Sequence, residues 1–101
     1  MENLEIARVL SQMANLLEIQ NANPFRVRAY RNAARTVDGH ATPMRKLVES
    51  GADLTELAGI GKDMASHIGE LVETGALSAL NELTVRIPRT LIDVMDLPGV
   101  G

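Results

Sequence analysis

A basic helical segment carries the residues whose types and spacing offer the clearest chemistry. Its four arginines, with no acidic residue between them, are Arg26, Arg28, Arg31 and Arg35. Arg26 precedes Tyr30 by one helical turn, so the guanidinium and the phenolic hydroxyl converge at one edge of the helix. Both groups donate hydrogen bonds to phosphate oxygens, which makes the pair suitable for a terminal phosphate. The alternative is a solvated helix face with a core tyrosine, and the pattern alone favours neither interpretation.

A pattern of the form Leu-x-Gly-aliphatic-Gly occurs twice, as LAGIG at residues 57–61 and as LPGVG at residues 97–101. The glycines permit positive φ angles and close approach of the backbone, and the central aliphatic side chain fills the groove between two helices. The helix that follows presents free N–H groups and the positive end of its dipole, where a phosphate binds without base contacts. The pattern predicts a helix-hairpin-helix motif that binds the DNA backbone. The alternative is a plain glycine-rich turn.

Short helices are expected to position these residues. The predicted helices span residues 3–19, 24–38, 42–49, 62–74 and 78–85, with single helical turns at 53–57 and 91–96. The predicted N-caps are Asn3, Asn23 and Ser78, and Thr42-Pro43 repeats the cap-and-proline signal of Asn23-Pro24. Because no segment alternates like a strand, the sequence predicts an all-α fold. We expect a compact bundle of short helices with one helix-hairpin-helix motif and the start of a second at the carboxyl end.

The composition is that of one globular domain. The chain has 101 residues, 46% of them apolar, and no cysteine, so disulfides and thiolate metal sites are excluded. The two aromatic residues are Tyr30 and Phe25, and Phe25 is interpreted as a core residue or a helix-terminal hydrophobic staple, with stacking on DNA as the alternative. No apolar run approaches the roughly 20 residues of a membrane span, and no basic secretion signal is present. We expect a soluble, cytoplasmic monomer.

The chain's net charge of −3 excludes a protein that coats nucleic acid through its overall field. Any DNA contact therefore depends on a local basic patch or on backbone amides. A helical interaction module that binds no DNA is one alternative, which the charge favours and the arginine cluster opposes. A generic tandem hairpin module of another DNA-processing protein, such as a ligase or nuclease subunit, is a second alternative. That module has no need of Arg26 beside Tyr30.

Residues 23–35, NPFRVRAYRNAAR, resemble the second helix of bacterial and archaeal family X DNA polymerases. LAGIGK at 57–62 resembles the first hairpin of their polymerase beta-like amino-terminal domain, in the same order and spacing, and residues 97–101 resemble the start of their second hairpin. The resemblance implies a DNA-binding domain at residues 1–86. Residues 87–101 would be a linker and a truncated second hairpin, so we expect a piece of a longer protein.

By this resemblance, the partner is gapped or nicked duplex DNA, held at its 5′-phosphate during gap filling in base excision repair. The candidate DNA-binding residues are Arg26, Arg28, Tyr30, Arg31, Arg35, Gly59, Ile60, Gly61 and Lys62. Arg26 and Tyr30 would contact the phosphate, and the hairpin would hold the downstream strand through backbone amides and one ammonium. The resemblance also implies a Na or K ion on the backbone carbonyls of Thr55, Leu57 and Ile60.

Relatives remove a 5′-deoxyribose phosphate through a lysine Schiff base, and at that position this chain has His67. Imidazole forms no stable Schiff base, so weak or absent lyase activity is expected, with Lys62 as a possible substitute amine. His67 and His40 are otherwise interpreted as surface or half-buried histidines. Nucleotidyl transfer needs carboxylates that hold paired Mg, and no such set is present. Polymerase chemistry, and any nuclease domain, would therefore lie beyond Gly101, and no cofactor other than the hairpin ion is expected.

Overall fold

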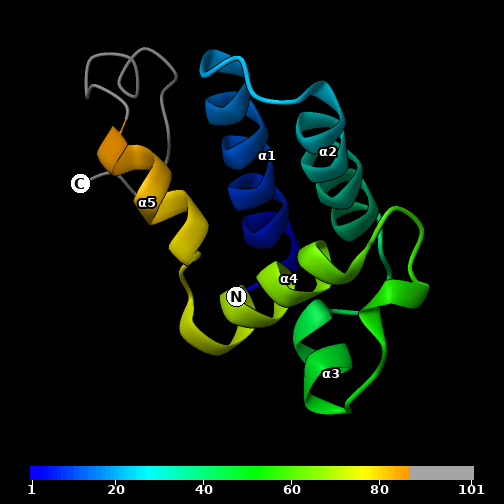
Figure 1. Ribbon diagram of the computed structural model, residues 1–101. Coiled ribbons are helices and arrows are strands. Elements are labelled where there is room, and N and C mark those ends of the chain that lie inside the picture. The colour runs from blue at the N-terminus through cyan, green and yellow to red at the C-terminus, as the bar shows by residue number, and fades with distance from the viewer. Residues whose placement is uncertain (87–101) are drawn as a thin grey trace.

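The computed structural model describes residues 1–86, so the expected linker and second hairpin at residues 87–101 lie outside the described part (Figure 1). The elements are α1 (Asn3–Ile19), α2 (Pro24–Asp38), α3 (Met44–Glu49), the 3-10 turn η1 (Leu54–Glu56), α4 (Lys62–Thr74) and α5 (Ser78–Arg86). Within residues 1–86 there is no strand, and the all-α prediction is confirmed. None of the described helices has the length and apolar character that a membrane crossing requires.

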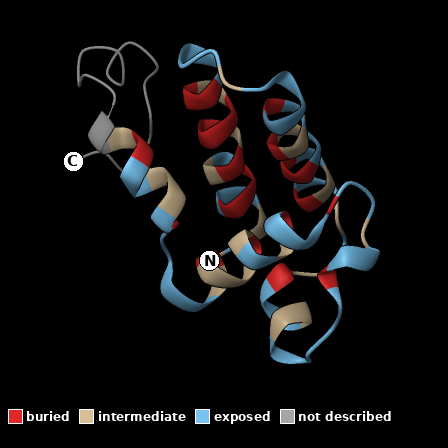
Figure 2. Ribbon diagram, in the orientation of Figure 1, coloured by how far each residue is buried: buried red, intermediate tan, exposed pale blue. Residues whose placement is uncertain are grey.

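The core lies between α1 and α2, which run side by side, and α4 crosses near their ends (Figure 1). α5 lies against α1 on the side away from α2, and α3 lies below α4. The stripe predicted on α1 is buried, and its members are Ile6, Leu10, Met13 and Leu17. The face predicted on α2 is also buried, and its members are Tyr30, Ala33, Ala34 and Val37. Figure 2 shows this burial concentrated on the facing sides of the two helices. Helical periodicity in the sequence therefore identified the principal interface correctly.

The amino end of α1 differs from the prediction. Glu2, not Asn3, is the N-cap, and its N–H donates to the Glu5 carboxylate over 3.3 Å. Asn3 is the first helical residue, and its side chain is directed at the start of α3. Its Oδ1 accepts from the Met44 N–H at 2.7 Å, and its Nδ2 donates to the Thr42 carbonyl at 3.1 Å. Asn3 thus caps a helix that begins 41 residues later.

The caps of α2, α3 and α5 give a mixed outcome. Asn23 caps α2 as predicted, because its Oδ1 accepts from the Phe25 N–H at 2.8 Å. Thr42 does not cap α3, where Pro43 is the N-cap and supplies no side-chain acceptor. Ser78 is not a cap either, since it lies inside α5. The Glu70 carboxylate accepts from the Ser78 N–H at 3.0 Å and from its hydroxyl, and it satisfies an amide that the first turn leaves unpaired.

Candidate nucleic-acid interface

The hairpin between η1 and α4 is built around one buried side chain and one left-handed glycine. Ile60 is 4% exposed and belongs to the hydrophobic core, as expected for the central aliphatic residue of the motif. Gly59 has φ of +76°, a conformation that residues with a Cβ rarely adopt. Gly61 is extended, with φ of −88°, so the expectation of positive φ at both glycines is wrong for Gly61. Asp53 fixes the approach to the hairpin by accepting from the Thr55 N–H at 3.0 Å, and the Thr55 hydrogen bonds lower the pKa of Asp53.

The hairpin packs closely against α2. A Cβ on Gly59 would lie 3.4 Å from the Asn32 Cβ, so the backbone approaches α2 to within side-chain contact. The Thr36 hydroxyl donates to the Ala58 carbonyl over 2.7 Å. The arginine helix and the hairpin are consequently held in a fixed relation.

Between these elements is an open depression of about 450 Å³, here called the α2–α4 hollow. Five of the candidate DNA-binding residues from the sequence line this hollow, namely Arg26, Tyr30, Gly59, Gly61 and Lys62. The hollow therefore unites the Arg26–Tyr30 pair with the hairpin, although the two segments are separate in sequence. The side chains of Phe25, Asp63 and His67 also line it. Arg26 is the member of the arginine cluster that reaches this hollow.

The amino end of α4 opens into the same hollow. Gly61, its N-cap, has no side chain to satisfy the first amides of the helix, and a Cβ there would meet nothing within 4 Å. Those first N–H groups have no partner within a helix and carry the positive end of the dipole. The Ile60 amide is engaged inside the hairpin, where it donates to the Leu57 carbonyl at 3.1 Å. The Leu57 oxygen is one of the carbonyls implied for a cation, and that ion site stays a prediction.

Tyr30 and His67 form a contact that the sequence analysis did not identify. The Tyr30 hydroxyl oxygen lies 3.0 Å from His67 Nε2, and the two rings stack with centroids 5.6 Å apart and planes 20° apart. Burial raises the pKa of the Tyr30 hydroxyl, and nearby Arg26 opposes that rise. Burial lowers the pKa of His67, against the acidic side chains of Asp63 and Glu70. Tyr30 and His67 are 37 positions apart in the sequence. The one sequence signal that drew attention to His67 was the expectation that it replaces the family's lysine.

The other arginines of α2 point elsewhere. The Arg28 guanidinium lies 5.8 Å from the centre of the Phe25 ring. Arg31 forms an exposed ion pair with Glu18 at 3.1 Å. Arg28 and Arg31 line another hollow, of about 410 Å³, beside the turn between α1 and α2. Arg35 is exposed. The structure therefore does not bring the four arginines to one site, and Arg26 is the member beside the hairpin.

The interpretation of Phe25 as a core residue is wrong. Its side chain is 74% exposed, at the edge of the α2–α4 hollow and beside Arg28. An exposed aromatic ring of this kind offers a flat surface for a base, and the stacking alternative stays a prediction.

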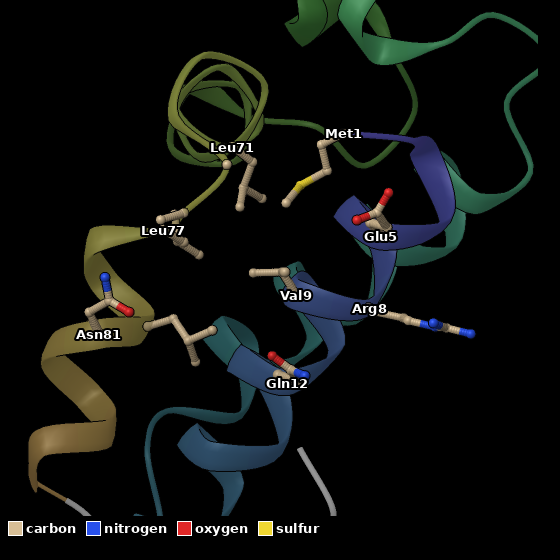
Figure 3. Close-up of a pocket in the computed structure, with 11 residues that line it drawn as sticks. Met1, Glu5, Arg8, Val9, Gln12, Leu71, Leu77 and Asn81 are labelled. Carbon is tan, nitrogen blue, oxygen red and sulfur yellow. The ribbon is translucent and has the colours of Figure 1, made fainter. Parts of the chain in front are cut away.

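A further hollow of about 330 Å³ lies between α1 and the junction of α4 with α5 (Figure 3). It shares no lining residue with the α2–α4 hollow. Its apolar lining includes Met1, Val9, Leu71 and Leu77. The side chain of Arg8, which also borders it, points away in Figure 3. This further hollow is therefore a gap between packed helices. The side chains that can bind phosphate line the α2–α4 hollow instead.

A left-handed glycine and a buried aliphatic residue here bring a bare helix terminus to the surface beside a basic helix. That geometry defines the class of helix-hairpin-helix DNA-binding domains. The chain belongs to this family, since residues 1–77 match the family model described as a helix-hairpin-helix domain. It is also similar to a protein of Bacillus subtilis (strain 168) named DNA polymerase/3′-5′ exonuclease PolX, with 33% identity over 101 residues. The match covers 100% of this chain and 17% of that relative, and it confirms the resemblance to the family X polymerases.

Proposed function

We propose that this domain binds gapped or nicked duplex DNA at the downstream 5′-phosphate, without reading the base sequence. The observation that carries the proposal is the α2–α4 hollow, because Arg26, Tyr30 and Lys62 line it together with the amino end of α4. A guanidinium, an ammonium and free backbone amides are the groups that bind phosphate oxygens. None of them distinguishes one base pair from another.

The two hairpin glycines support a DNA backbone as the ligand. The space beside Gly61 is open, so a phosphate can approach the first amides of α4 without meeting a side chain. Asp63 is the opposing charge in the hollow, and it favours the helix dipole while it repels an anion. Recognition therefore depends on Arg26 and Lys62 to outweigh that carboxylate.

For the whole protein, the family X likeness supports a polymerase that fills short gaps in base excision repair. This chain spans 17% of its curated relative's length, so nucleotidyl transfer and its Mg are assigned to other parts of such a protein. Within this domain, Lys62 is the amine that lines the hollow, and His67 stands beside Tyr30 in place of a lysine. We expect weak or absent lyase activity, and any borohydride-trapped adduct should require Lys62.

Fluorescence anisotropy on a short-gapped duplex tests the proposal, with 5′-phosphate and 5′-hydroxyl ends compared at low salt. A hydrogen bond to a charged group contributes about 1.5–3 kcal/mol, so Arg26→Ala should reduce the preference for the phosphate by about tenfold or more. Arg8→Ala is the matched control, because it removes the same charge from a side chain outside the α2–α4 hollow. Arg8→Ala should retain the preference.

Salt dependence supplies a second readout. If Lys62 neutralises one phosphate, Lys62→Ala should lower the slope of log affinity against log salt by about 0.9 on duplex DNA. Equal binding of the two ends by the wild type would reduce the domain to a generic backbone-binding hairpin. Absence of binding to any duplex would instead support a protein-interaction module.

A further inference from the structure

The Tyr30 hydroxyl has two possible hydrogen-bond roles toward His67. The oxygen and Nε2 lie 3.0 Å apart, so either the hydroxyl donates to Nε2 or an Nε2–H donates to the hydroxyl oxygen. A hydroxyl carries one proton. When that proton is donated to His67, it is not available to a phosphate oxygen in the hollow. Whether Nε2 carries a hydrogen thus decides whether Tyr30 can act as a phosphate donor, and protonation of His67 ensures that Nε2 does carry one.

We propose that His67 is a positioning residue for Tyr30, and that binding of a 5′-phosphate is coupled to uptake of a proton by His67. The inference rests on the proposed function, because it assigns a role within the same site. In the imidazolium form both ring nitrogens carry a hydrogen, so Nε2 can only donate. The Tyr30 proton is then released to face the phosphate, and the imidazolium adds a positive charge beside it.

The surroundings of His67 favour the neutral form in the free domain and allow a phosphate to reverse it. Burial, the largest influence, lowers the pKa of His67, and Arg26 on α2 acts in the same direction. Asp63 and Glu70 on α4 act in the opposite direction. A phosphate beside Arg26 offsets its positive charge and introduces an anion near the imidazole. Both changes raise the pKa of His67 in the complex.

The packing keeps the two side chains together during this change. Tyr30 is 1% exposed, and its ring stacks on that of His67 at 5.6 Å. Tyr30 and His67 both line the α2–α4 hollow, so a phosphate bound there would lie beside this pair. A proton at His67 changes the direction of one hydrogen bond without displacing either ring.

The coupling predicts a pH dependence of definite sign. Between the lower pKa of the free state and the higher pKa of the complex, binding takes up a proton, so affinity rises as pH falls. The limit for one proton is about tenfold per pH unit. The DNA 5′-phosphate has a titration of its own at about pH 6 and loses charge in acid, which acts in the opposite direction. A variant without the imidazole separates the two effects.

The experiment measures the preference for 5′-phosphate over 5′-hydroxyl in gapped duplex from about pH 5.5 to 8. It compares the wild type with His67→Gln, which keeps a donor and an acceptor but does not titrate. His40→Gln is the matched control, since His40 forms a hydrogen bond with Thr42 in a loop outside the α2–α4 hollow. The wild type and His40→Gln should gain preference toward low pH by severalfold relative to His67→Gln.

An NMR titration of the His67 ring in the unmodified protein provides a readout that needs no variant to fold. The pKa of His67 should rise in the complex with the 5′-phosphate duplex and not in the complex with the 5′-hydroxyl duplex. An equal pKa in the two complexes would overturn the coupling. Parallel pH profiles for wild type and His67→Gln, with the phosphate preference retained, would also overturn it and leave the proposed function intact. Equal affinity for both ends at every pH would overturn both.

Discussion

The Thr36 hydroxyl donates a hydrogen bond to the Ala58 carbonyl oxygen over 2.7 Å, and this contact joins α2 directly to the hairpin. The next residue, Gly59, approaches the Asn32 side chain closely enough that an added Cβ would lie 3.4 Å away. Two segments that are separate in sequence are therefore held in one arrangement. That arrangement places Arg26 of α2 and Lys62 of α4 around the same hollow.

Gly59→Ala should destabilise the domain and weaken DNA binding. A Cβ at φ of +76° costs about 1–2 kcal/mol, and the new methyl group also presses on Asn32. Gly75→Ala is the matched control, because Gly75 has φ of +74° and an added Cβ there meets nothing within 4 Å. Chemical denaturation should show a loss of unfolding free energy in both variants. Anisotropy on gapped DNA should show a loss of affinity in Gly59→Ala alone, and equal affinities would mean that close packing of the hairpin on α2 is not needed for binding.

Phe25→Ala should weaken DNA binding without changing stability. The side chain is 74% exposed, so its removal should alter the free energy of unfolding by less than about 0.5 kcal/mol. Stacking of an aromatic ring on a base contributes about 1–3 kcal/mol, so affinity for gapped DNA should fall by at least several fold. Leu4→Ala, which removes another exposed apolar side chain from α1, serves as the control for nonspecific effects. An unchanged affinity in Phe25→Ala would exclude stacking.

The parts of the fold that depend on local periodicity could be predicted from the sequence. The bounds of α1, α2 and α4 follow from apolar spacing, from Asn23-Pro24 and from Gly75. The burial of Ile60 in the hairpin could likewise be predicted, because the glycine pattern around it is contiguous in sequence. These features depend on interactions between residues a few positions apart, so the order of residue types is enough to predict them.

The parts that depend on contacts between distant segments could not be predicted. Asn3 is a residue type that commonly caps its own helix, yet its side chain accepts a hydrogen bond from the Met44 N–H. The sequence gives no distance between Tyr30 and His67, which only the crossing of α2 by α4 brings to 3.0 Å. Phe25 was assigned to the core because large apolar residues are usually buried. Its exposure depends on which way the first turn of α2 faces, and that is a tertiary property.

Asn3→Ala should destabilise the domain by about 1 kcal/mol, since loss of a capping side chain costs about 0.5–2 kcal/mol. The loss should be concentrated at α3, where the Met44 N–H loses its 2.7 Å acceptor. Hydrogen exchange should therefore accelerate at Met44, whereas Asn23→Ala should accelerate it at Phe25. Asn3→Asp keeps the acceptor and should protect Met44 better than Asn3→Ala does. If Asn3→Ala left exchange at Met44 unchanged, the assignment of this long-range cap would be wrong.

Acidification should weaken the junction of α4 with α5 through Glu70. The hydrogen bonds from the Ser78 hydroxyl and amide hold the pKa of the Glu70 carboxyl below its usual value of 4.5. The folded state therefore binds this proton less readily than the unfolded state. The stability from these hydrogen bonds is present above about pH 4.5 and is lost as pH falls through the lowered pKa.

Thermal unfolding from about pH 7 to 3, followed in the wild type and in Ser78→Ala, measures this contribution. Ser78→Ala removes the hydroxyl donor, the larger cause of the lowered pKa, and keeps the amide donor. Its Tm should be lower at neutral pH and should converge on that of the wild type in acid. The exposed Asp53–Thr55 contact loses its hydrogen bonds at low pH as well, but it is common to both proteins and cancels in the comparison. A constant difference in Tm across the whole range would show that Glu70 binds its proton equally with and without the Ser78 hydroxyl. The hydrogen bond assigned to that hydroxyl and this carboxylate would then contribute no pH-dependent stability.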